Sequence, residues 1–372
     1  MRVARIEPLA FRNLADAPVE LGSGLTVLHG PNGAGKTNLL EALFFALTGR
    51  SCRTRREREA IRFGAELTRV EAWLEPSDEG EGGGLEIAEP MTMLASVSSG
   101  EARRRLVDGS PARAEDDRRR PALSVFMPDR LALVKGPPSP RRAHLDRLAA
   151  ALRPARADLR RAYSQTLAQR NNLLARIRRG GDPATLAAWD RELAERAAPL
   201  VEARAEAASE LTEPFVEAAS ELGLAGGADI AYRPRTGELD VEGIVAELAE
   251  RREGDIGRGF TGYGPHRDEV EISFGGRSLR RYGSQGQQRL GLLSLLFAER
   301  EALRRARRQL PLMLLDDVMS ELDPERRERL ARMLEGDGQA LITATELAHV
   351  PGEGAHRIAI SAGEAMPEGV SR

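Results

Sequence analysis

Residues 30–37 read Gly-Pro-Asn-Gly-Ala-Gly-Lys-Thr, and this stretch decides the fold. It follows the apolar run 25–29 and precedes the apolar run 39–45, so the predicted order is strand, glycine-rich turn and helix. A loop of this kind points successive backbone N–H groups, and the positive end of a helix dipole, toward a phosphate. The stretch therefore predicts a nucleotide-binding site; the alternative is an unrelated glycine loop.

Each position of this loop has an expected role. Gly30, Gly33 and Gly35 supply sharp turns or positive φ angles. Lys36 would reach the β- and γ-phosphates, and Thr37 would bind Mg²⁺. Only two of the 55 Lys and Arg residues are lysine, so a lysine at this position indicates a need for a compact ammonium group. The nucleotide-binding residues expected here are Gly30, Pro31, Asn32, Gly33, Ala34, Gly35, Lys36 and Thr37.

Composition bounds the class of protein. The 372 residues carry a net charge of −2 and are 41% hydrophobic, which allows a real core and excludes a uniformly basic nucleic-acid binder. A single cysteine, Cys52, excludes a disulfide framework and indicates a reducing compartment. No run approaches the roughly 18 apolar residues of a membrane span, and no signal-peptide core is present. We expect a cytoplasmic protein with no membrane partner.

The order of elements predicts an α/β fold with an insertion. Expected strands lie at 3–6, 25–29, 68–74, 91–97, 123–127, 230–232, 269–274, 312–315, 340–343 and 357–360, with a hairpin at 105–110 and an acidic, glycine-rich loop at 79–84. Expected helices in the second half lie at 241–252, at 285–307 and after Asp323-Pro324. We place the α/β head at 1–137 and 228–372, and a helical lobe at 138–227.

The lobe is rich in Ala, Leu, Arg and Glu. Its helices are expected to break at Pro154, at 180–183, near Pro199 and near Pro214. Within it, a face with a leucine every seven residues is expected to pack on a partner helix; these residues are Leu186, Leu193 and Leu200.

A second part of the nucleotide site follows the apolar run 312–315, which ends in Asp316 and Asp317. Buried strands end at the face where nucleotides bind. Asp316 would hold Mg²⁺, directly or through water, and Asp317 would orient and deprotonate the attacking water. With Lys36, these two aspartates are the candidate catalytic residues. The alternative is a turn or helix cap, but the upstream phosphate loop favours the catalytic interpretation.

Two further segments indicate the branch of ATPases. Residues 283–289, Gly-Ser-Gln-Gly-Gln-Gln-Arg, begin a long helix and resemble the signature motif of ABC-type ATPases; 320–323, Ser-Glu-Leu-Asp, resemble their D-loop. Ser284, Gly286 and Gln287 would bind a γ-phosphate through the hydroxyl and the helix N-terminus. In the ABC architecture this motif faces the phosphate loop of another protomer, so we expect a homodimer that closes on two ATP molecules. Taken alone, the motif would be an ordinary helix cap.

With these motifs in place, nearly the whole chain resembles the RecF family, the bacterial recombination-mediator ATPases of the SMC-like ABC group. Beyond the ATPase motifs, the resemblance rests on residues 11–14, 48–54, 126–129, 133–137, 141–146, 169–172 and 264–268. It implies an ABC/SMC-type P-loop ATPase head with an inserted all-helical lobe, and ATP and Mg²⁺ as cofactors. In related ATPases, groups near the start of the chain hold nucleotide, so Arg12 and Asn13 are candidates; the alternative is a strand-end pair that caps the sheet.

The resemblance also implies a function on DNA. ATP would drive homodimerisation at single-strand/double-strand junctions or gaps, without sequence specificity, and RecO and RecR would cooperate in loading the recombinase. Hydrolysis would then release the dimer, in recombinational repair, replication restart and the SOS response. Arg-rich clusters that could contact DNA phosphates lie at 53–58, 103–105, 118–120, 176–179 and 304–308, although Arg is the default base of this chain. Aromatic residues make up only 4%, which favours recognition of backbone and shape over base stacking.

Three departures from the ABC pattern predict slow hydrolysis, suited to a timed switch. The stretch 126–129 has no clear Q-loop glutamine. Thr343-Ala-Thr345 occupies the place where many ABC proteins have histidine. Asp317 replaces the usual glutamate and shortens its reach to water by one methylene. Two alternatives remain: a transporter's ABC subunit, which would have a Q-loop, a switch histidine and a short insert, and an SMC-like structural clamp, which would need longer coiled-coil arms.

Overall fold

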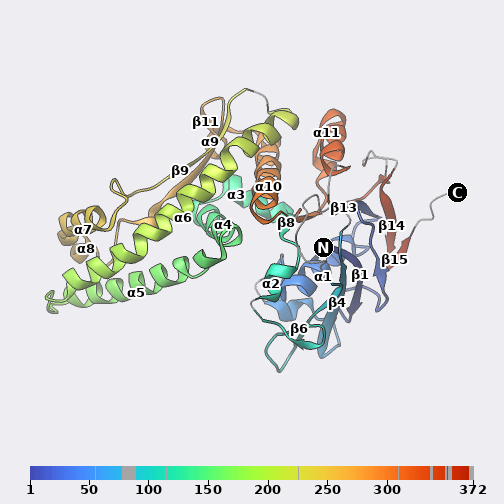
Figure 1. The fold of residues 1–372 in the computed structure, drawn as a ribbon, viewed down its shortest axis with the longest axis horizontal. Helices are drawn as coiled ribbons and strands as arrows, with labels where there is room; N and C mark the ends of the chain where they lie inside the picture. The colour runs from blue at the N-terminus through green and yellow to red at the C-terminus, as the bar shows by residue number, and fades with distance from the viewer. Residues whose placement is uncertain are drawn as a thin grey trace. The chain divides into compact units, whose positions relative to one another are not determined.

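The contacts in the computed structural model divide the chain into two compact units (Figure 1). The first consists of Met1–Arg130 and Leu303–Arg372, and the second of Leu131–Ala302. The structure describes residues 1–54, 56–77, 89–113, 115–224, 226–308, 310–335, 338–347, 350 and 354–367. The loop expected at 79–84 lies outside the described residues.

A mostly parallel sheet of the first unit carries the nucleotide motifs. Its strands, in spatial order, are β15 (Glu364–Pro367), β14 (His356–Ser361), β3 (Leu25–His29), β13 (Ala340–Ala344), β12 (Leu312–Leu315) and β8 (Leu123–Phe126). The pair β14–β15 is antiparallel, and the other pairs are parallel. β12 and β13 are buried along their whole length, as is usual for parallel strands covered on both faces. Because β13 lies between β3 and β12, the carboxyl ends of these three strands meet at one edge.

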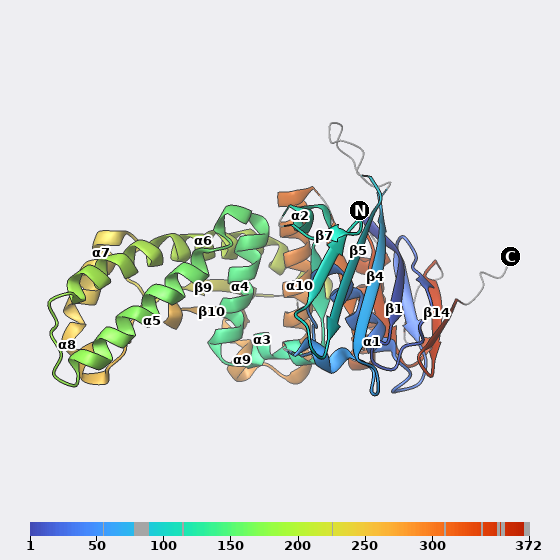
Figure 2. The same cartoon turned by 90° about the horizontal axis from the view of Figure 1, so that it is seen from below.

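An antiparallel sheet forms the other layer of this unit (Figure 2). Its strands, in spatial order, are β2 (Val19–Glu20), β1 (Arg2–Leu9), β4 (Leu67–Glu75), β5 (Met91–Ser98), β6 (Arg104–Val107) and β7 (Ser110–Pro111). In β5, fully buried and partly buried residues alternate, as in a sheet with one face on the core. Helix α1 (Lys36–Thr48) contacts β4, β5 and β13, so its apolar side chains join the two sheets into one core.

The expected hairpin at 105–110 is confirmed. Asp108 and Gly109, between β6 and β7, have φ angles of 49° and 76°. Positive φ at both central residues is what the type I′ hairpin turn requires, and it accounts for the Asp-Gly pair.

The second unit is built on three helices, α4 (Pro138–Leu152), α5 (Leu159–Ile177) and α6 (Leu186–Glu221), shown in green to yellow-green in Figure 1. The leucines at 186, 193 and 200 are all buried, and α6 packs along α5, which confirms the predicted packing face. The predicted breaks at Pro154 and at 180–183 are also confirmed.

The breaks expected near Pro199 and Pro214 are wrong, because α6 continues through both prolines. Each proline removes one backbone hydrogen bond. Contacts along α6 with α4, α5, α7 and β9 outweigh that loss.

The second unit is larger than the predicted lobe at 138–227 and is not all helical. It includes the antiparallel sheet β11–β10–β9, formed by β9 (Ala228–Arg233), β10 (Glu269–Phe274) and β11 (Arg277–Ser278). It also contains α3 (Ala132–Lys135), α7 (Val241–Glu250), α8 (Arg252–Arg258), α9 (Leu279–Tyr282) and most of α10 (Gln285–Arg307). The reason is packing: β9 lies on α6, and Ile244 and Leu248 of α7 share a core with Leu193 and Leu200.

The predicted bounds of the remaining elements hold to within a few residues, with two kinds of exception. The single helix expected at 241–252 is two helices, α7 and α8, which meet at Arg251. The strands β2, β11 and β15 are not predicted, because such short strands carry too little periodicity. The first unit also contains α2 (Asp116–Arg119) and α11 (Pro324–Glu335). Among the described residues, no helix combines the length and hydropathy that crossing a bilayer requires.

Candidate nucleotide-binding site

The loop between β3 and α1 has the backbone geometry that its glycines predict. Gly30, Gly33 and Gly35 have φ angles of 147°, 80° and 119°, which L-residues with a side chain rarely adopt. At Gly30 there is also no room: a Cβ atom would lie 2.1 Å from the backbone oxygen of Ile360 in β14. The loop can therefore follow this path only with glycine at position 30.

Lys36 is folded into this loop. Its ammonium group donates hydrogen bonds to the backbone oxygens of Gly30 (2.6 Å) and Pro31 (3.0 Å). Burial lowers the pKa of Lys36, and the charges of Asp317 and Asp316 oppose that shift. The amine is thus held where a β- or γ-phosphate resting on the loop could replace its two carbonyl partners.

The two predicted magnesium ligands lie together although they are far apart in the chain. Thr37 donates a hydrogen bond of 2.7 Å from Oγ1 to Oδ1 of Asp316. Asp316 is 5% exposed and lies at the end of β12. A threonine hydroxyl and an aspartate carboxylate are hard oxygen donors of the kind Mg²⁺ prefers, so these residues fit the ion.

A third residue, Thr343 near the end of β13, contacts both aspartates. Its Oγ1 donates to Oδ1 of Asp316 (2.8 Å) and accepts the backbone N–H of Asp317 (2.8 Å). Asp317 itself adopts a left-handed conformation with a φ of 49°, which aspartate tolerates better than most residues. Sequence reasoning treated Thr343 only as a missing histidine. The available signal was its place at the end of the predicted strand 340–343.

Asn13 and Arg12 have different partners. Asn13 donates from Nδ2 to the backbone oxygen of Gly33 (3.1 Å), so it contacts the phosphate loop. Arg12 makes two hydrogen bonds, of 3.0 and 2.9 Å, to the fully buried carboxylate of Glu41 on α1, and a third to the backbone of Glu59. The Arg12 guanidinium therefore neutralises a buried charge in the head. A nucleotide contact by either residue stays a prediction.

A turn that sequence reasoning missed also supports the loop. Gly363, between β14 and β15, donates its N–H to the backbone oxygen of Ala34 (2.8 Å) and accepts the N–H of Ala15 (2.8 Å). A Cβ atom at Gly363 would lie 1.9 Å from the backbone oxygen of Asn13. The turn thus joins the phosphate loop to the segment that follows β1. The only signal in the sequence was the Ala-Gly pair in the final strand region.

The signature-like motif caps α10 in the second unit. The N–H of Ser284 donates to Oε1 of Gln287 (2.9 Å), and the N–H of Gln287 donates to Oγ of Ser284 (3.2 Å). This reciprocal pair is a capping box, so the helix-cap role considered as an alternative is present. Ser284 is exposed, and Gly286 lies in the first turn. The cap occupies the N–H of Gln287, whereas the hydroxyl of the exposed Ser284 keeps its hydrogen for donation to an anion.

Other candidates for chemistry are weaker. Burial, reinforced by Glu41, raises the pKa of the Cys52 thiol to about 12, so it is no nucleophile near neutral pH. Two arginines from the proposed DNA-contact clusters pair with acids of this unit, Arg53 with Glu41 and Arg103 with Glu57. No cluster of three His, Cys, Asp or Glu side chains suited to a metal occurs in the described part of the chain.

Comparison with known proteins yields one consistent family. Residues 2–358 match the family model described as the RecF/RecN/SMC N terminal domain. Proteins named DNA replication and repair protein RecF are 40% identical in Anaeromyxobacter sp. (strain Fw109-5) and 35% identical in Heliobacterium modesticaldum; each alignment covers 93% of this chain and 93% of the relative.

Comparison with solved structures supports the same family. The structure described as the recombination mediator protein RecF-ATP in the RecFOR pathway superposes with a TM-score of 0.84 at 27% identity, covering 99% of this chain and 97% of that one. An Smc head bound to the C-winged helix domain of ScpA has a TM-score of 0.58 at 15% identity and shows the fold alone.

Proposed function

Because this chain belongs to the RecF family of DNA replication and repair proteins, which has the fold of ABC/SMC-type ATPase heads, we propose that it is an ATP-operated switch on DNA. ATP binding closes a homodimer on gapped DNA or on a single-strand/double-strand junction. Slow hydrolysis opens it again. The observation that carries the proposal is that Thr37, at the start of α1, and Thr343, near the end of β13, both donate to Oδ1 of Asp316, which follows β12.

Nucleotide binding follows from the chemistry of the loop. The backbone N–H groups after β3 and the N-terminus of α1 bind the phosphates, and Lys36 moves from its carbonyl partners to a phosphate oxygen. Thr37 and Asp316 would hold Mg²⁺, which would supply positive charge against the phosphates of the nucleotide. The ATP-bound structure of a relative at 27% identity supports ATP as the nucleotide.

Hydrolysis depends on Asp317. Its carboxylate accepts the proton of the attacking water, and its backbone is fixed by the Oγ1 of Thr343. An aspartate reaches less far than the glutamate usual in ABC proteins, so the water is held less well. We expect a turnover below about 1 s⁻¹, the lower end of the range typical of dedicated enzymes.

Dimerisation involves the start of α10. Ser284, Gly286 and Gln287 present a hydroxyl and helix N-terminal N–H groups that can bind the γ-phosphate of a nucleotide held by a second copy. The capping box keeps these groups ordered before the phosphate arrives. Two symmetric contacts of this kind, one for each ATP, would couple nucleotide binding to closure.

The cellular role follows from the family. The chain aligns over 93% of relatives named for DNA replication and repair, which supports a role in recombinational repair and replication restart. A relative's structure is described as part of the RecFOR pathway, which supports RecO and RecR as partners in recombinase loading. We extend the proposal to the SOS response and to a cytoplasmic location.

The dimer step is tested by measuring molar mass by light scattering with and without ATP. We expect the mass of wild-type protein to double with ATP. Lys36→Met should lose ATP binding and doubling, whereas Ser284→Arg should bind ATP yet stay monomeric. Ser164→Arg, on the exposed face of α5, is the matched control and should dimerise. Doubling that needs no ATP, or that survives Ser284→Arg, would contradict the proposal.

A further inference from the structure

A cavity in the second unit takes no part in the ATPase site. Its volume is about 820 Å³, and four arginines line it: Arg142, Arg235, Arg251 and Arg267. No aspartate or glutamate is among the residues that line it. A volume of this size matches sites for small ligands or for a short stretch of a polymer. The concentration of one sign of charge in a hollow indicates an anionic ligand.

Three segments that support the family resemblance, and that the ATPase site does not use, meet at this cavity. Pro137 comes from the run 133–137, Arg142 from the run 141–146, and Arg267 from the run 264–268. Arg142 donates from Nη1 to the backbone oxygen of Asp268 (2.7 Å), which ties the second segment to the third. The cavity thus gives these motifs a common location.

The four guanidinium groups lack a directly paired carboxylate in the described part of the chain, although the charges of Asp268, Glu269 and Asp146 act on Arg142. Of the nearby carboxylates, Asp268 binds Arg204 and Tyr232. Glu247 accepts hydrogen bonds only from the neutral donors Gly237 and Tyr263, and its buried Oε2 has no partner among the described groups. The four arginines outnumber this carboxylate. Positive charge is therefore available to a ligand.

Two of the lining side chains are suited to recognition. The guanidinium of Arg251 stacks 4.0 Å from the centre of the Tyr263 ring, which orients the group and leaves its N–H edge free. Thr236 is 3% exposed, and its buried Oγ1 has no hydrogen-bond partner among the described groups. A buried hydroxyl without a partner is unfavourable, and an oxygen of a bound ligand would satisfy it.

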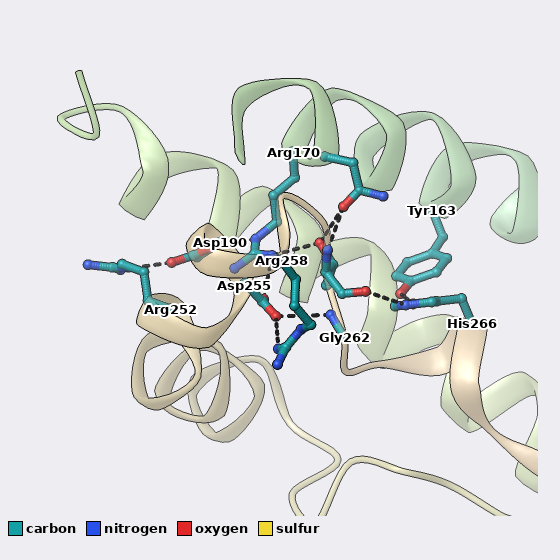
Figure 3. A network of polar contacts seen from close by, with 10 residues as sticks. Tyr163, Arg170, Asp190, Arg252, Asp255, Arg258, Gly262 and His266 are labelled. Atoms are coloured by element: carbon teal, nitrogen blue, oxygen red, sulfur yellow. Dashed lines mark hydrogen bonds and ion pairs between the residues drawn. The ribbon is translucent and has the colours of Figure 1, made fainter. Parts of the chain in front are cut away.

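Two residues that line the cavity, Gly262 and His266, belong to a network of polar contacts (Figure 3). Arg170, which is fully buried, donates to Asp255 (2.9 Å), and Asp255 accepts the N–H of Gly262 (3.0 Å). The ring of His266 accepts a hydrogen bond from Tyr163 at Nδ1 (2.7 Å) and donates from Nε2 to a backbone oxygen (3.1 Å). Hydrogen bonds therefore hold Gly262 and His266 in place without a ligand.

We propose that this cavity is a second phosphate-binding site, which takes the phosphate groups of a nucleic-acid backbone or of a free polyphosphate. The planar guanidinium of arginine can donate two hydrogen bonds to the oxygens of a phosphate. Four guanidinium groups carry more positive charge than a single carboxylate ligand would neutralise. The site belongs to the other unit from the phosphate loop and does not depend on ATP.

The test uses the full-length protein without ATP, so that failure here leaves the ATP-switch proposal standing. One arm measures anisotropy of a fluorescent oligothymidylate across a salt series. The other measures the rise in Tm on adding inorganic tripolyphosphate, in a Lys36→Met background that disables the phosphate loop. The variants are Arg235→Glu with Arg267→Glu, and Thr236→Val. The charge-matched control is Arg161→Glu with Arg277→Glu, two exposed arginines of the same unit away from the cavity.

If DNA is the source of the phosphate, the double variant should lose at least tenfold in oligothymidylate affinity, and its salt slope should fall by about two. If a free polyphosphate is the source, the tripolyphosphate-induced rise in Tm should vanish in the double variant. Thr236→Val should weaken whichever ligand binds while raising the Tm of the ligand-free protein. Affinities and Tm shifts equal to those of the control in both arms would overturn the proposal.

Discussion

The hydroxyl of Thr343 lies 2.8 Å from Oδ1 of Asp316, and it also accepts the backbone N–H of the next residue, Asp317. One side chain therefore holds the carboxylate of Asp316 and the backbone of Asp317. The contact exists because β13 lies between β3 and β12, so its end lies beside the phosphate loop and beside the carboxylates. Where many ABC proteins have a histidine, this chain has a threonine that hydrogen-bonds Asp316 and the backbone of Asp317.

Replacing Thr343 by valine tests this role. The isosteric change leaves the N–H of Asp317 and one lone pair of Asp316 without their partner, so the water-binding carboxylate loses its position. We expect kcat to fall by about tenfold, as a misplaced catalytic group typically costs, with the KM for ATP nearly unchanged. Thr343→Ser keeps the hydroxyl and should retain most of the activity. Equal turnover in the valine variant and wild type would show that Thr343 does not act on Asp317.

Asp317 is expected to be the general base. Asp317→Asn removes the proton acceptor, and hydrolysis should fall by about 10² to 10⁴-fold while ATP binding persists. Asp317→Glu adds the methylene that other ABC proteins have, and we expect it to hydrolyse ATP at least as fast as wild type. A phosphate-release assay with saturating ATP measures both. An asparagine variant with wild-type turnover would assign the proton transfer to another group.

The turn at Gly363 should be as intolerant of a side chain as the phosphate loop itself. Gly363→Ala would bring Cβ to 1.9 Å from the backbone oxygen of Asn13, so the loop support must shift. Gly64 has the same φ of 87° but nothing within 4 Å of its Cβ position, so Gly64→Ala isolates the cost of the backbone conformation. We expect the first variant to bind ATP several-fold more weakly and to lose more stability than the roughly 1 kcal/mol expected of the second. If calorimetry shows the same loss of stability in Gly363→Ala and Gly64→Ala, the steric clash at Gly363 has no effect.

His266 predicts a pH dependence of stability. Burial, together with the charges of Arg267 and Arg142, lowers the pKa of His266 to about 4. The unfolded chain takes up this proton near pH 6.5, whereas the folded chain resists it. The contribution is therefore fully present above about pH 6.5 and is lost as the pH falls toward 4. Between pH 7 and pH 5 we expect a loss of about 2 kcal/mol. Urea unfolding of wild type and His266→Gln should show a flatter profile in the variant; parallel profiles would refute the assignment.

The sequence predicts well those features that depend on adjacent residues. In three segments the residue types alone predict the local geometry. These are the loop at 30–37, the strand at 312–315 with its two carboxylates, and the turn at Asp108-Gly109. The contact between Thr37 and Asp316 also follows once the family order of motifs is accepted.

What the sequence does not predict depends on packing between distant segments. Nothing near Thr343 shows that it contacts Asp316, because that contact requires the strand order β3–β13–β12. Pro199 suggests a break, but packing along the whole of α6 keeps the helix continuous. The cavity likewise cannot be predicted from the sequence, because its four arginines come from four separate segments of the chain.

The central claim, that ATP gates binding to DNA, is tested most directly with a fluorescent gapped duplex titrated with and without ATP. Wild type, Lys36→Met and Ser284→Arg are compared, with Ser164→Arg as the control. We expect ATP to tighten binding markedly over the weak contact made without it, and this increase to be lost in the Lys36 and Ser284 variants and kept in the control, because the phosphate loop and the signature motif must close on the same nucleotide. Binding that is equally tight without ATP and in all variants would contradict it.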